Sequence, residues 1–365
     1  MPTHPILDDL TDPRRFAVLD PHDMMGLALK FPQQCREAVA IGRQFAPEPP
    51  GRADVRQIVV TGLGGSAIGG DFARCLTDAY GPVPLLVNRD YTLPHFVGPH
   101  TLVIAGSYSG NTEETLAAYA AARTAGAQLM AVTSGGKLGE MAKADGVPVA
   151  LVPGGQPPRS ATGYMFFPLI GYLAHRGLLG RDLAADLAET LSNLEALIAA
   201  LGPEVPIEQN PAKQLAVALH GKLPILYGSQ GYRGAVAYRW KSQFNENAKQ
   251  AAFANVFPEQ NHNEILAWTL AARQAQNWAV IFLRDPEEVS ETPRIARRVE
   301  VTKELIAPVA QVHEVWARGQ SLLARMFHLI YFADFLTIYL AYLNGICPTD
   351  IGAIDHLKAE MAKLG

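Results

Sequence analysis

The sequence predicts an α/β protein made of two similar subdomains, each a parallel β-sheet flanked by helices in a doubly wound arrangement. Short apolar strands alternate with helical segments, and this rhythm starts again near residue 200. The clearest correspondence between the halves is the pair of strand–turn openings Val59-Val60-Thr61-Gly62 and Ile225-Leu226-Tyr227-Gly228. Continuous apolar runs of this kind are typical of parallel strands that are covered on both faces.

The first half supplies five predicted strands with helices between them. The strands are expected at residues 57–61, 83–87, 101–105, 128–133 and 148–152. A glycine turn over residues 62–70 separates the first strand from a helix that begins at Asp71. Further helices are expected at residues 112–125, 137–144, 161–175 and 182–201.

The second half repeats the pattern with strands at residues 223–229, 278–283 and 309–315, and helices at 232–249, 292–306 and 322–344. We therefore expect an N-terminal subdomain with an extension over residues 1–200, a second subdomain over 201–345, and a C-terminal tail over 346–365. The last long helix is apolar enough to test as a membrane span. It contains Arg325, His328 and Asp334, which are costly in hydrocarbon, so we interpret it as a buried core helix.

Composition excludes several classes of partner. The chain has 365 residues and a formal net charge of -4, so it has no broad basic field for nucleic acid or an anionic membrane. Its three cysteines are far apart and form no C-x-x-C pattern, which fits a reducing cytoplasm. The acidic, proline-rich start of the chain lacks the layout of a signal peptide.

The glycine-rich segment after the first strand has two interpretations. Gly62-Leu63-Gly64-Gly65-Ser66-Ala67 comes close to the dinucleotide fingerprint G-x-G-x-x-G/A, but no acidic residue directly ends the following strand to hold a ribose. The other interpretation is a tight crossover from strand to helix. The segment alone leaves both open.

A second turn favours an anion. Ser107, Ser109 and Thr112 place three hydroxyls within six residues after a buried strand. Gly110 and Asn111 tolerate a left-handed backbone, so the loop can turn its N–H groups inward. Asn111 or Thr112 can cap the next helix, whose N-terminus attracts a phosphate. An ordinary hydroxyl-rich helix cap is the plain alternative, and we expect a phosphate site.

Several motifs together resemble a known family. The two turns, Gly64–Gly70 and Ser107–Thr115, look like those of the sugar isomerase (SIS) domain, whose subdomains are flavodoxin-like. Further segments narrow the resemblance to bifunctional phosphoglucose/phosphomannose isomerases; they are Pro158-Arg159-Ser160, Phe244-Asn245-Glu246-Asn247-Ala248-Lys249, Asn261-His262-Asn263-Glu264 and Ile354-Asp355-His356-Leu357-Lys358. Gln260 stands where many relatives have Arg.

The resemblance implies a reaction and a set of residues. It implies interconversion of glucose 6-phosphate or mannose 6-phosphate with fructose 6-phosphate through a cis-enediolate, without metal or cofactor, in a homodimer. Glu246 would be the base, His262 and Lys358 would open the sugar ring, and Arg159 would stabilise the oxyanion. The phosphate and nearby hydroxyls would be bound by Gly65, Ser66, Ser107, Ser109 and Thr112. His262 would reach the active site of the partner subunit.

Plainer alternatives exist for each residue and for the whole chain. Taken alone, Glu246 and Lys358 are ordinary surface residues, His262 a loop histidine and Arg159 a residue of a proline turn. No H-E-x-x-H motif or histidine cluster supports a zinc-dependent mannose phosphate isomerase. A non-catalytic SIS sugar-phosphate sensor, the isomerase half of an amidotransferase, and an isomerase of another phosphosugar are the remaining alternatives.

Overall fold

The structure is a computed structural model that describes residues 5–8, 10, 18–45 and 54–364. The described chain divides into two compact units. The first unit comprises Lys30–Leu194 and Gly319–Arg325. The second comprises the described residues before Lys30, Glu195–Arg318, and those from Met326 onward.

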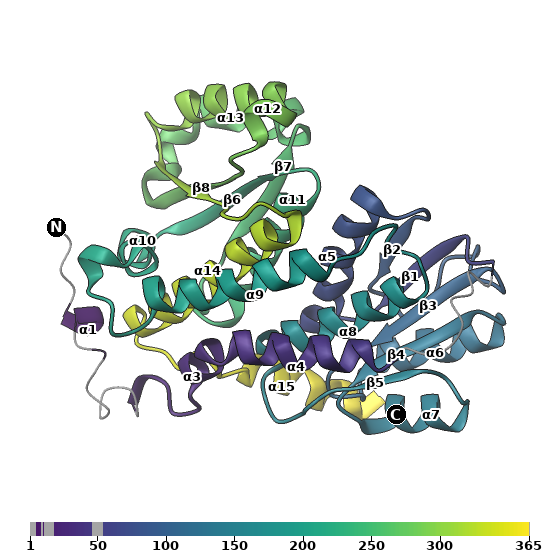
Figure 1. Ribbon diagram of the computed structural model, residues 1–365. Helices are drawn as coiled ribbons and strands as arrows, with labels where there is room; N and C mark the ends of the chain where they lie inside the picture. Colours follow the sequence, from purple (N-terminus) through teal and green to yellow (C-terminus); the bar gives the residue numbers. More distant parts are fainter. Residues whose placement is uncertain (1–4, 9, 11–17, 46–53, 365) are drawn as a thin grey trace. The chain divides into compact units, whose positions relative to one another are not determined.

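The first unit is built on a five-stranded parallel sheet with the order β2-β1-β3-β4-β5 (Figure 1). Its strands are β1 (Gln57–Thr61), β2 (Leu85–Asn88), β3 (Thr101–Gly106), β4 (Gln128–Thr133) and β5 (Val149–Leu151). All five predicted strands of the first half are therefore confirmed, with boundaries that move by one or two residues. β1 and β3 are hydrogen-bonded neighbours, so the turns that follow them lie at the same edge of the sheet.

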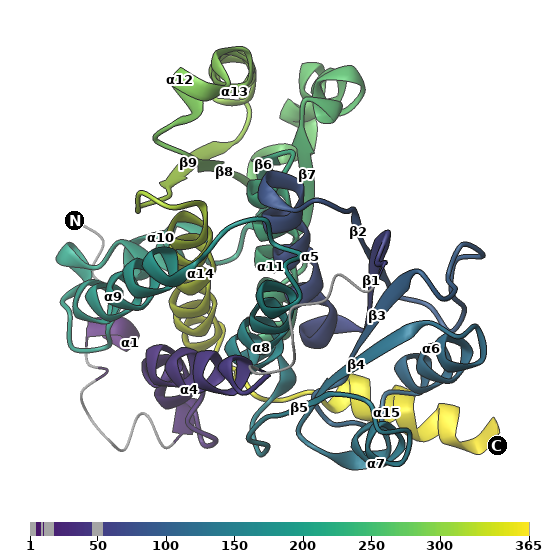
Figure 2. The ribbon, with the colours of Figure 1, turned by 45° about the vertical axis from the view of Figure 1, so that its right-hand side comes forward.

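Helices cover both faces of the first sheet, as Figure 2 shows. Val59, Val103 and Ala131 alternate with their neighbours along the strands and point toward α6 (Glu113–Thr124) and α7 (Gly136–Ala144). The opposite face packs on α5 (Gly64–Tyr80) and α8 (Thr162–His175). Outside α8 lies α4 (Phe31–Arg43), which was not predicted.

The second unit is built on a four-stranded parallel sheet with the order β7-β6-β8-β9. Its strands are β6 (Leu223–Ser229), β7 (Phe253–Phe257), β8 (Trp278–Arg284) and β9 (Gln311–Trp316). One face packs a core of Tyr227, Phe257 and Phe282 against α13 (Pro293–Ile306). On the other face lies α11 (Tyr232–Glu246), whose Trp240 donates a hydrogen bond from Nε1 to the carbonyl of Leu329 on α14 (Leu322–Leu343).

The two sheets share one topology, which confirms the predicted α/β class with a repeated subdomain. In each, the first strand is central, the second lies on one side, and the third and fourth follow on the other. By this order β1, β2, β3 and β4 correspond to β6, β7, β8 and β9. The turns after β3 and β8 are therefore equivalent positions in the two units.

Four details differ from the prediction. The glycine turn is wrong in extent, because the helix α5 begins at Gly64, and the small residues up to Gly70 form its first turns. The helix predicted to reach Lys249 ends at Glu246. Strand β7 was missed, since its first two residues are exposed and Asn255 interrupts its apolar pattern. A series of short 3-10 helices follows β7; it comprises Glu259–His262, Glu264–Thr269, Ala271–Arg273 and Ala275–Asn277.

The long apolar helix α14 is a buried core helix, as predicted. Among the described residues it is the one helix long and apolar enough to cross a membrane, and 94% of its most apolar stretch is buried inside the protein. The polar residues on α14 also face protein: the side chain of Gln243 on α11 donates a hydrogen bond to Asp334. The apolar composition of α14 is therefore explained by packing.

The ends of the chain group differently from the prediction. The extension before Lys30 was assigned to the first subdomain, but its described residues belong to the second unit. Lys213, on α10 (Pro211–Leu219), donates from Nζ to the carbonyl of Leu7 (3.2 Å), and Tyr331 donates to the carbonyl of Ala28 (2.6 Å). α9 (Ala184–Leu201) crosses the boundary between the units, and the predicted tail contains the helix α15 (Gly352–Met361).

Candidate active site

The turn after β3 is held in one conformation by its own polar groups. Ser107 is fully buried, and its Oγ lies 2.9 Å from the Oγ1 of Thr112. Thr112 occupies the N-cap position of α6 but makes no side-chain cap, because its hydroxyl is paired with Ser107. Ser109 is the exposed hydroxyl of the three. The turn is therefore rigid before any ligand arrives.

Gly110 is the residue that this turn requires. Its φ is +71°, and a Cβ there would lie 1.8 Å from the carbonyl oxygen of Gly135. Its carbonyl accepts a hydrogen bond from Leu138 N (2.9 Å), and the side chain of Asn111 accepts one from Lys137 N (3.1 Å). These contacts fasten the turn to the start of α7.

The start of α6 presents donors to this turn. Within the described part of the chain, no hydrogen bond engages the backbone N–H groups of Ser109, Glu113 or Glu114. Such N–H groups at a helix N-terminus, together with the helix dipole, form a suitable seat for a phosphate. The donors that face an anion here are thus backbone groups and the Ser109 hydroxyl.

Ser66 joins the two predicted loops. It lies in the first turn of α5, and its Oγ accepts a hydrogen bond from the N–H of Tyr108 at 3.0 Å. The carboxyl ends of β1 and β3 therefore converge, as the sequence predicted for neighbouring strands.

Gly65 and Arg159 are also brought together. Arg159 is buried, with 3% of its surface exposed, on the 3-10 helix η1 (Pro158–Ser160), which packs on α5. A Cβ at Gly65 would lie 2.7 Å from the Pro158 oxygen and 3.1 Å from the Arg159 nitrogen. The lack of a side chain at Gly65 therefore lets the segment of Arg159 pack against the first turn of α5.

Gln34 holds this segment from the other side. Its Nε2 donates to the carbonyl of Ser160 (2.8 Å), and its Oε1 accepts from the N–H of Gly163 (2.9 Å). Sequence reasoning missed Gln34, because the helix α4 that carries it was not predicted. Its two bonds fix the approach of Arg159 to the start of α8.

In the second unit, Glu246 is the last residue of α11 and is partly exposed. The C-terminal end of a helix carries the negative end of its dipole, so a carboxylate is placed there against the local electrostatics. Residues that break a local rule of this kind are often functional.

Lys249 compensates for this arrangement. Its φ is +49°, and its Nζ donates to three carbonyl oxygens: those of Glu246 (2.8 Å), Cys347 (2.9 Å) and Pro348 (3.0 Å). The ammonium therefore neutralises the end of α11 and ties it to the segment that leads into α15. Lys249 lies in the segment predicted around Glu246, but no role was predicted for it.

The end of α11 is further held on α14. Asn247 donates from Nδ2 to Thr337 Oγ1 (3.0 Å), and Arg239 lies 3.9 Å from Asp334. Burial raises the pKa of the Asp334 carboxyl to about 6, although Arg239 acts in the opposite direction. This polar contact fixes the rotation of α11 and with it the direction of Glu246.

His262 and Lys358 lie on exposed parts of the second unit. His262 ends the 3-10 helix η3 (Glu259–His262), which Asn261 anchors to α13 through its Nδ2 bond to Thr302 Oγ1 (3.0 Å). Gln260 is buried, and its Nε2 lies 3.5 Å from the same hydroxyl. Lys358 lies on α15, which has no buried residue. Both side chains are accessible within their own unit.

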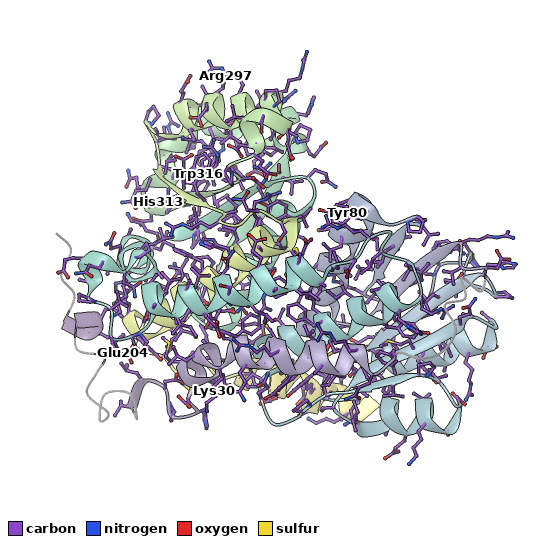
Figure 3. All side chains as sticks on the ribbon, viewed as in Figure 1. Lys30, Tyr80, Glu204, Arg297, His313 and Trp316 are labelled. Carbon is purple, nitrogen blue, oxygen red and sulfur yellow. The ribbon has the colours of Figure 1, made fainter. Side chains whose placement is uncertain are left out.

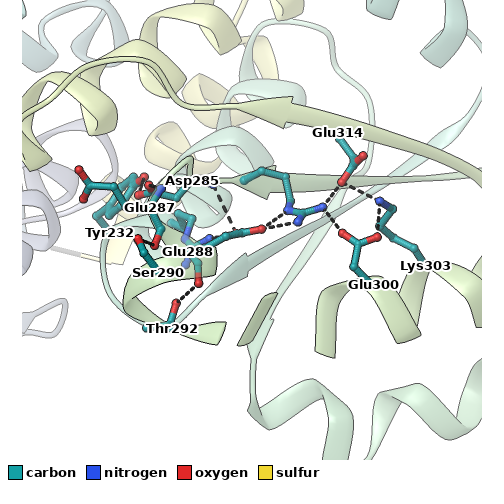
Figure 4. A network of polar contacts seen from close by, with 11 residues as sticks. Tyr232, Asp285, Glu287, Glu288, Ser290, Thr292, Glu300, Lys303 and Glu314 are labelled. Carbon is teal, nitrogen blue, oxygen red and sulfur yellow. Dashed lines mark hydrogen bonds and ion pairs between the residues drawn. The ribbon is translucent and has the colours of Figure 1, made fainter. Parts of the chain in front are cut away.

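The edge of the second sheet that corresponds to the phosphate turn contains an internal anion (Figure 4). Glu288 follows β8 and is 1% exposed; its carboxylate is paired with Arg233 and Arg284. Tyr232 donates to Asp285 beside it. A side-chain carboxylate thus occupies this position in the second unit.

Among the residues that the structure describes, no group of three or more His, Cys, Asp or Glu side chains is arranged to hold a metal ion. The chemistry available in the two units is that of carboxylate, imidazole, ammonium and guanidinium groups. These groups serve general acid–base catalysis and the stabilisation of an oxyanion.

Comparison with known proteins identifies the family of the chain. A family profile described as the bacterial phospho-glucose isomerase C-terminal SIS domain matches residues 208–361. A bifunctional phosphoglucose/phosphomannose isomerase of Caldicellulosiruptor bescii is 43% identical over 92% of this chain and 97% of its own length. The chain therefore belongs to the bifunctional phosphoglucose/phosphomannose isomerase family.

Two further similarities are informative. A D-glucosamine-6-phosphate 4-epimerase of Sulfolobus acidocaldarius is 34% identical over 59% of this chain and 65% of its own length. A crystal structure of a hypothetical protein from Thermus thermophilus superposes with a TM-score of 0.75 at 17% identity, covering 98% of this chain and 94% of that one. The superposition supports the fold, and the epimerase shows that a related chain has a different named activity.

Proposed function

We propose that this chain interconverts glucose 6-phosphate and mannose 6-phosphate with fructose 6-phosphate. The observation that carries this proposal is its membership of an isomerase family, through a relative 43% identical over nearly its whole length. The phosphate turn at the joined ends of β1 and β3 supports a phosphorylated substrate. A cytoplasmic location, which the cysteine pattern favours, is part of the proposal.

The proposed chemistry is a proton transfer between C1 and C2 of the open-chain sugar, without metal. Glu246 removes the proton, which produces a cis-enediolate, and returns it to the other carbon. Arg159 stabilises the negative charge that develops on the oxygen. His262 and Lys358 move the protons that open the sugar ring.

The phosphate end fixes the direction of the substrate. Backbone N–H groups at the start of α6, with Gly65, Ser66, Ser107, Ser109 and Thr112 around them, hold the phosphate on C6. Glucose and mannose 6-phosphates share one enediolate and differ in the face of C2 that receives the proton. Rotation about C2–C3 would let a single base serve both aldoses.

The quaternary structure is also part of the proposal. We infer a homodimer in which His262 enters the active site of the partner subunit. The exposed position of His262 on η3 is compatible with this role.

The decisive experiment is a coupled assay of the purified protein with fructose 6-phosphate in both directions. Glu246→Gln removes the base while keeping the size of the side chain, so we expect kcat to fall by at least about 10²-fold. Glu304→Gln is the matched control, because Glu304 is an exposed glutamate on α13 that pairs with Arg297. Absence of turnover in the wild type would refute the isomerase proposal, and a near-normal rate in Glu246→Gln would refute the assignment of the base.

The epimerase relative defines a second candidate function, a reaction at another carbon of a phosphorylated hexose. Incubation with glucosamine 6-phosphate, followed by NMR of the product, separates the two candidates. Turnover at C4 there, with no interconversion at C1–C2 of fructose 6-phosphate, would favour the epimerase. A non-catalytic sugar-phosphate sensor would bind both compounds and convert neither.

A further inference from the structure

The second unit contains a pocket of about 500 Å³ that shares no residue with the candidate active site. It is bounded by the end of α9, by α10, by the edge strand β9 and by α14. Figure 3 shows two of its residues, His313 and Trp316, on β9. Pockets of this size commonly bind small molecules.

We propose that this pocket binds a small organic acid, with the carboxylate held by Arg318 and the two histidine rings and an apolar body packed beside Phe332 and Leu215. This site goes beyond the isomerase activity and does not depend on it.

The charge of the pocket favours an anion. Glu314 is its one carboxylate, and it is paired with Arg284 and with Lys303, at 2.9 Å from Lys303 Nζ. Arg318 also lines the pocket, and among the described residues it makes no ion pair. The neutralised carboxylate and the unpaired guanidinium leave the pocket with a net positive charge. A guanidinium is suited to bind a carboxylate through two parallel hydrogen bonds.

Two imidazole nitrogens in the same pocket need partners. His328 is 5% exposed, and its Nδ1 has no hydrogen-bond partner among the described residues; the same holds for Nε2 of His313. A buried polar atom without a partner destabilises a protein, so a ligand that pairs with it is favoured. A half-turn of either ring about its Cβ–Cγ bond exchanges nitrogen and carbon positions, so each ring can turn a nitrogen toward a ligand.

The protonation state of the His313 and His328 rings suits them to form hydrogen bonds without carrying charge. Burial, with a smaller effect of Arg318, lowers the pKa of His328 to about 4, and burial lowers the pKa of His313. Both rings are therefore uncharged near neutral pH, and the guanidinium supplies the charge for the anion. An uncharged ring can donate one hydrogen bond to a carboxylate oxygen.

The remaining lining residues determine what kind of group the ligand can have beside its carboxylate. Leu197, Leu201, Leu215, Val315 and Phe332 are apolar, and Trp316 is held by the Arg284 guanidinium 4.4 Å from its ring centroid. A sugar phosphate would leave several hydroxyls against these walls without partners, which is costly. An acid with a compact apolar or aromatic body fits both parts of the lining.

The test is calorimetric titration of the full chain with phenylacetate, followed in parallel by tryptophan fluorescence; Trp316, one of four tryptophans, lines the pocket. We expect binding with a dissociation constant below about 1 mM. Phenylacetamide, which has the same body without the charge, should bind at least about tenfold more weakly. Inorganic phosphate has the charge without the body, so it should displace phenylacetate only at concentrations at least about tenfold higher.

Variants locate the site. Arg318→Gln and His328→Phe should each weaken phenylacetate binding by at least about tenfold. His328→Phe removes an unpartnered nitrogen, so it should fold at least as stably as the wild type. Arg297→Gln, an exposed arginine on α13 (Figure 3), should bind as the wild type does.

Several results would overturn the proposal. They are no binding of phenylacetate by the wild type, wild-type affinity in both Arg318→Gln and His328→Phe, or displacement of phenylacetate by inorganic phosphate at equal concentration. Competition by fructose 6-phosphate would also overturn it, because the acid would then occupy the isomerase site.

Discussion

At the scale of single residues, the candidate site depends on two glycines whose lack of a side chain allows another segment of backbone to approach closely. Gly65 has no side chain where the backbone of Pro158 and Arg159 approaches, and Gly110 has none where Gly135 approaches. The sequence placed both glycines in turns, whereas Gly65 lies in the first turn of α5. The close approach of η1 to α5 joins positions more than 90 residues apart. No local pattern in a sequence can show such a contact.

Replacing Gly65 with Ala tests this contact. The new methyl group would lie 2.7 Å from a backbone oxygen, so the segment of Arg159 must move. A displacement near 1 Å in an active site can cost up to about 10²-fold, and we expect kcat/KM for fructose 6-phosphate to fall by at least about tenfold. The measurement is steady-state kinetics in both directions.

Gly139→Ala is the matched control for that experiment. Gly139 lies in α7, and a Cβ there would be in ordinary contact, 3.6 Å from a methyl carbon of Thr133. A glycine in a helix is less stable than alanine by roughly 1 kcal/mol, so this variant should be active and slightly more stable. Equal activity of Gly65→Ala and Gly139→Ala would contradict the role of the close contact.

Residue types were predictable where geometry was not. Ser107, Ser109 and Thr112 were recognised from their density after a strand, and the structure places them in one turn at the start of α6. The different environments of the three hydroxyls were not predictable: Ser107 is buried and paired with Thr112, while Ser109 is exposed. These differences in burial and pairing arise from the folded conformation of the turn, which the sequence does not specify residue by residue.

At the scale of elements, the end of α11 is the feature that sets the position of Glu246 in the second unit. Glu246, at the negative end of the helix dipole, has its carbonyl bound by Lys249, whose ammonium also binds Cys347 and Pro348 carbonyls. Lys249 thus acts through Glu246 and is a positioning residue. Its left-handed backbone conformation is uncommon for a residue with a side chain and is maintained by these three bonds.

Replacing Lys249 with Met removes the ammonium and keeps much of the apolar stem. We expect kcat to fall by about tenfold with little change in KM, because Glu246, the proposed base, is displaced while the proposed phosphate turn is intact. Lys249→Arg restores a cation that can reach the same carbonyls, and it should recover most of the activity. A rise in KM at constant kcat, or no rescue by Arg, would contradict the positioning role.

The turn after β8 is equivalent in position to the turn after β3, but its structure differs. In the first unit the turn after β3 leaves backbone donors for an anion, and in the second Glu288 is buried between two arginines. The repeated order of strands was predictable from the apolar runs. Two features were not predictable: the strand β7, and the carboxylate of Glu288 in the turn after β8. Both depend on contacts between distant segments.

Glu288→Gln should destabilise the protein strongly, because it leaves Arg233 and Arg284 buried without this counter-ion. Breaking a buried ion pair in this way costs about 3–5 kcal/mol, measured as a decrease in the free energy of unfolding in urea. Glu304→Gln, at an exposed pair on α13, should change that free energy by less than about 1 kcal/mol. Similar values for the two variants would show that the buried network contributes little.

At the scale of the whole molecule, the proposed dimer makes a sharp prediction. Glu246→Gln and His262→Ala should each be inactive alone. In a refolded one-to-one mixture, half of the dimers contain one chain of each kind. If His262 serves the partner's site, one site in each mixed dimer has both wild-type residues, and about a quarter of the wild-type activity should return.

Failure of the mixture to recover activity, with mixed dimers demonstrated by differently tagged chains, would place His262 in the site of its own chain. A monomer in sedimentation would refute the dimer itself. The sequence suggested this arrangement only through resemblance, since no pattern within one chain identifies the subunit on which a side chain acts.

The buried carboxylate of Glu288 also fixes how many phosphosugars one chain can take up. A chain with two similar sheets has two equivalent turns, but an internal carboxylate already occupies one of them. Each chain should therefore saturate at one phosphosugar along a simple hyperbola. A single chain has one turn free to bind phosphate, and the equivalent turn is filled by its own carboxylate. Any sigmoidal response to substrate would therefore have to arise between subunits.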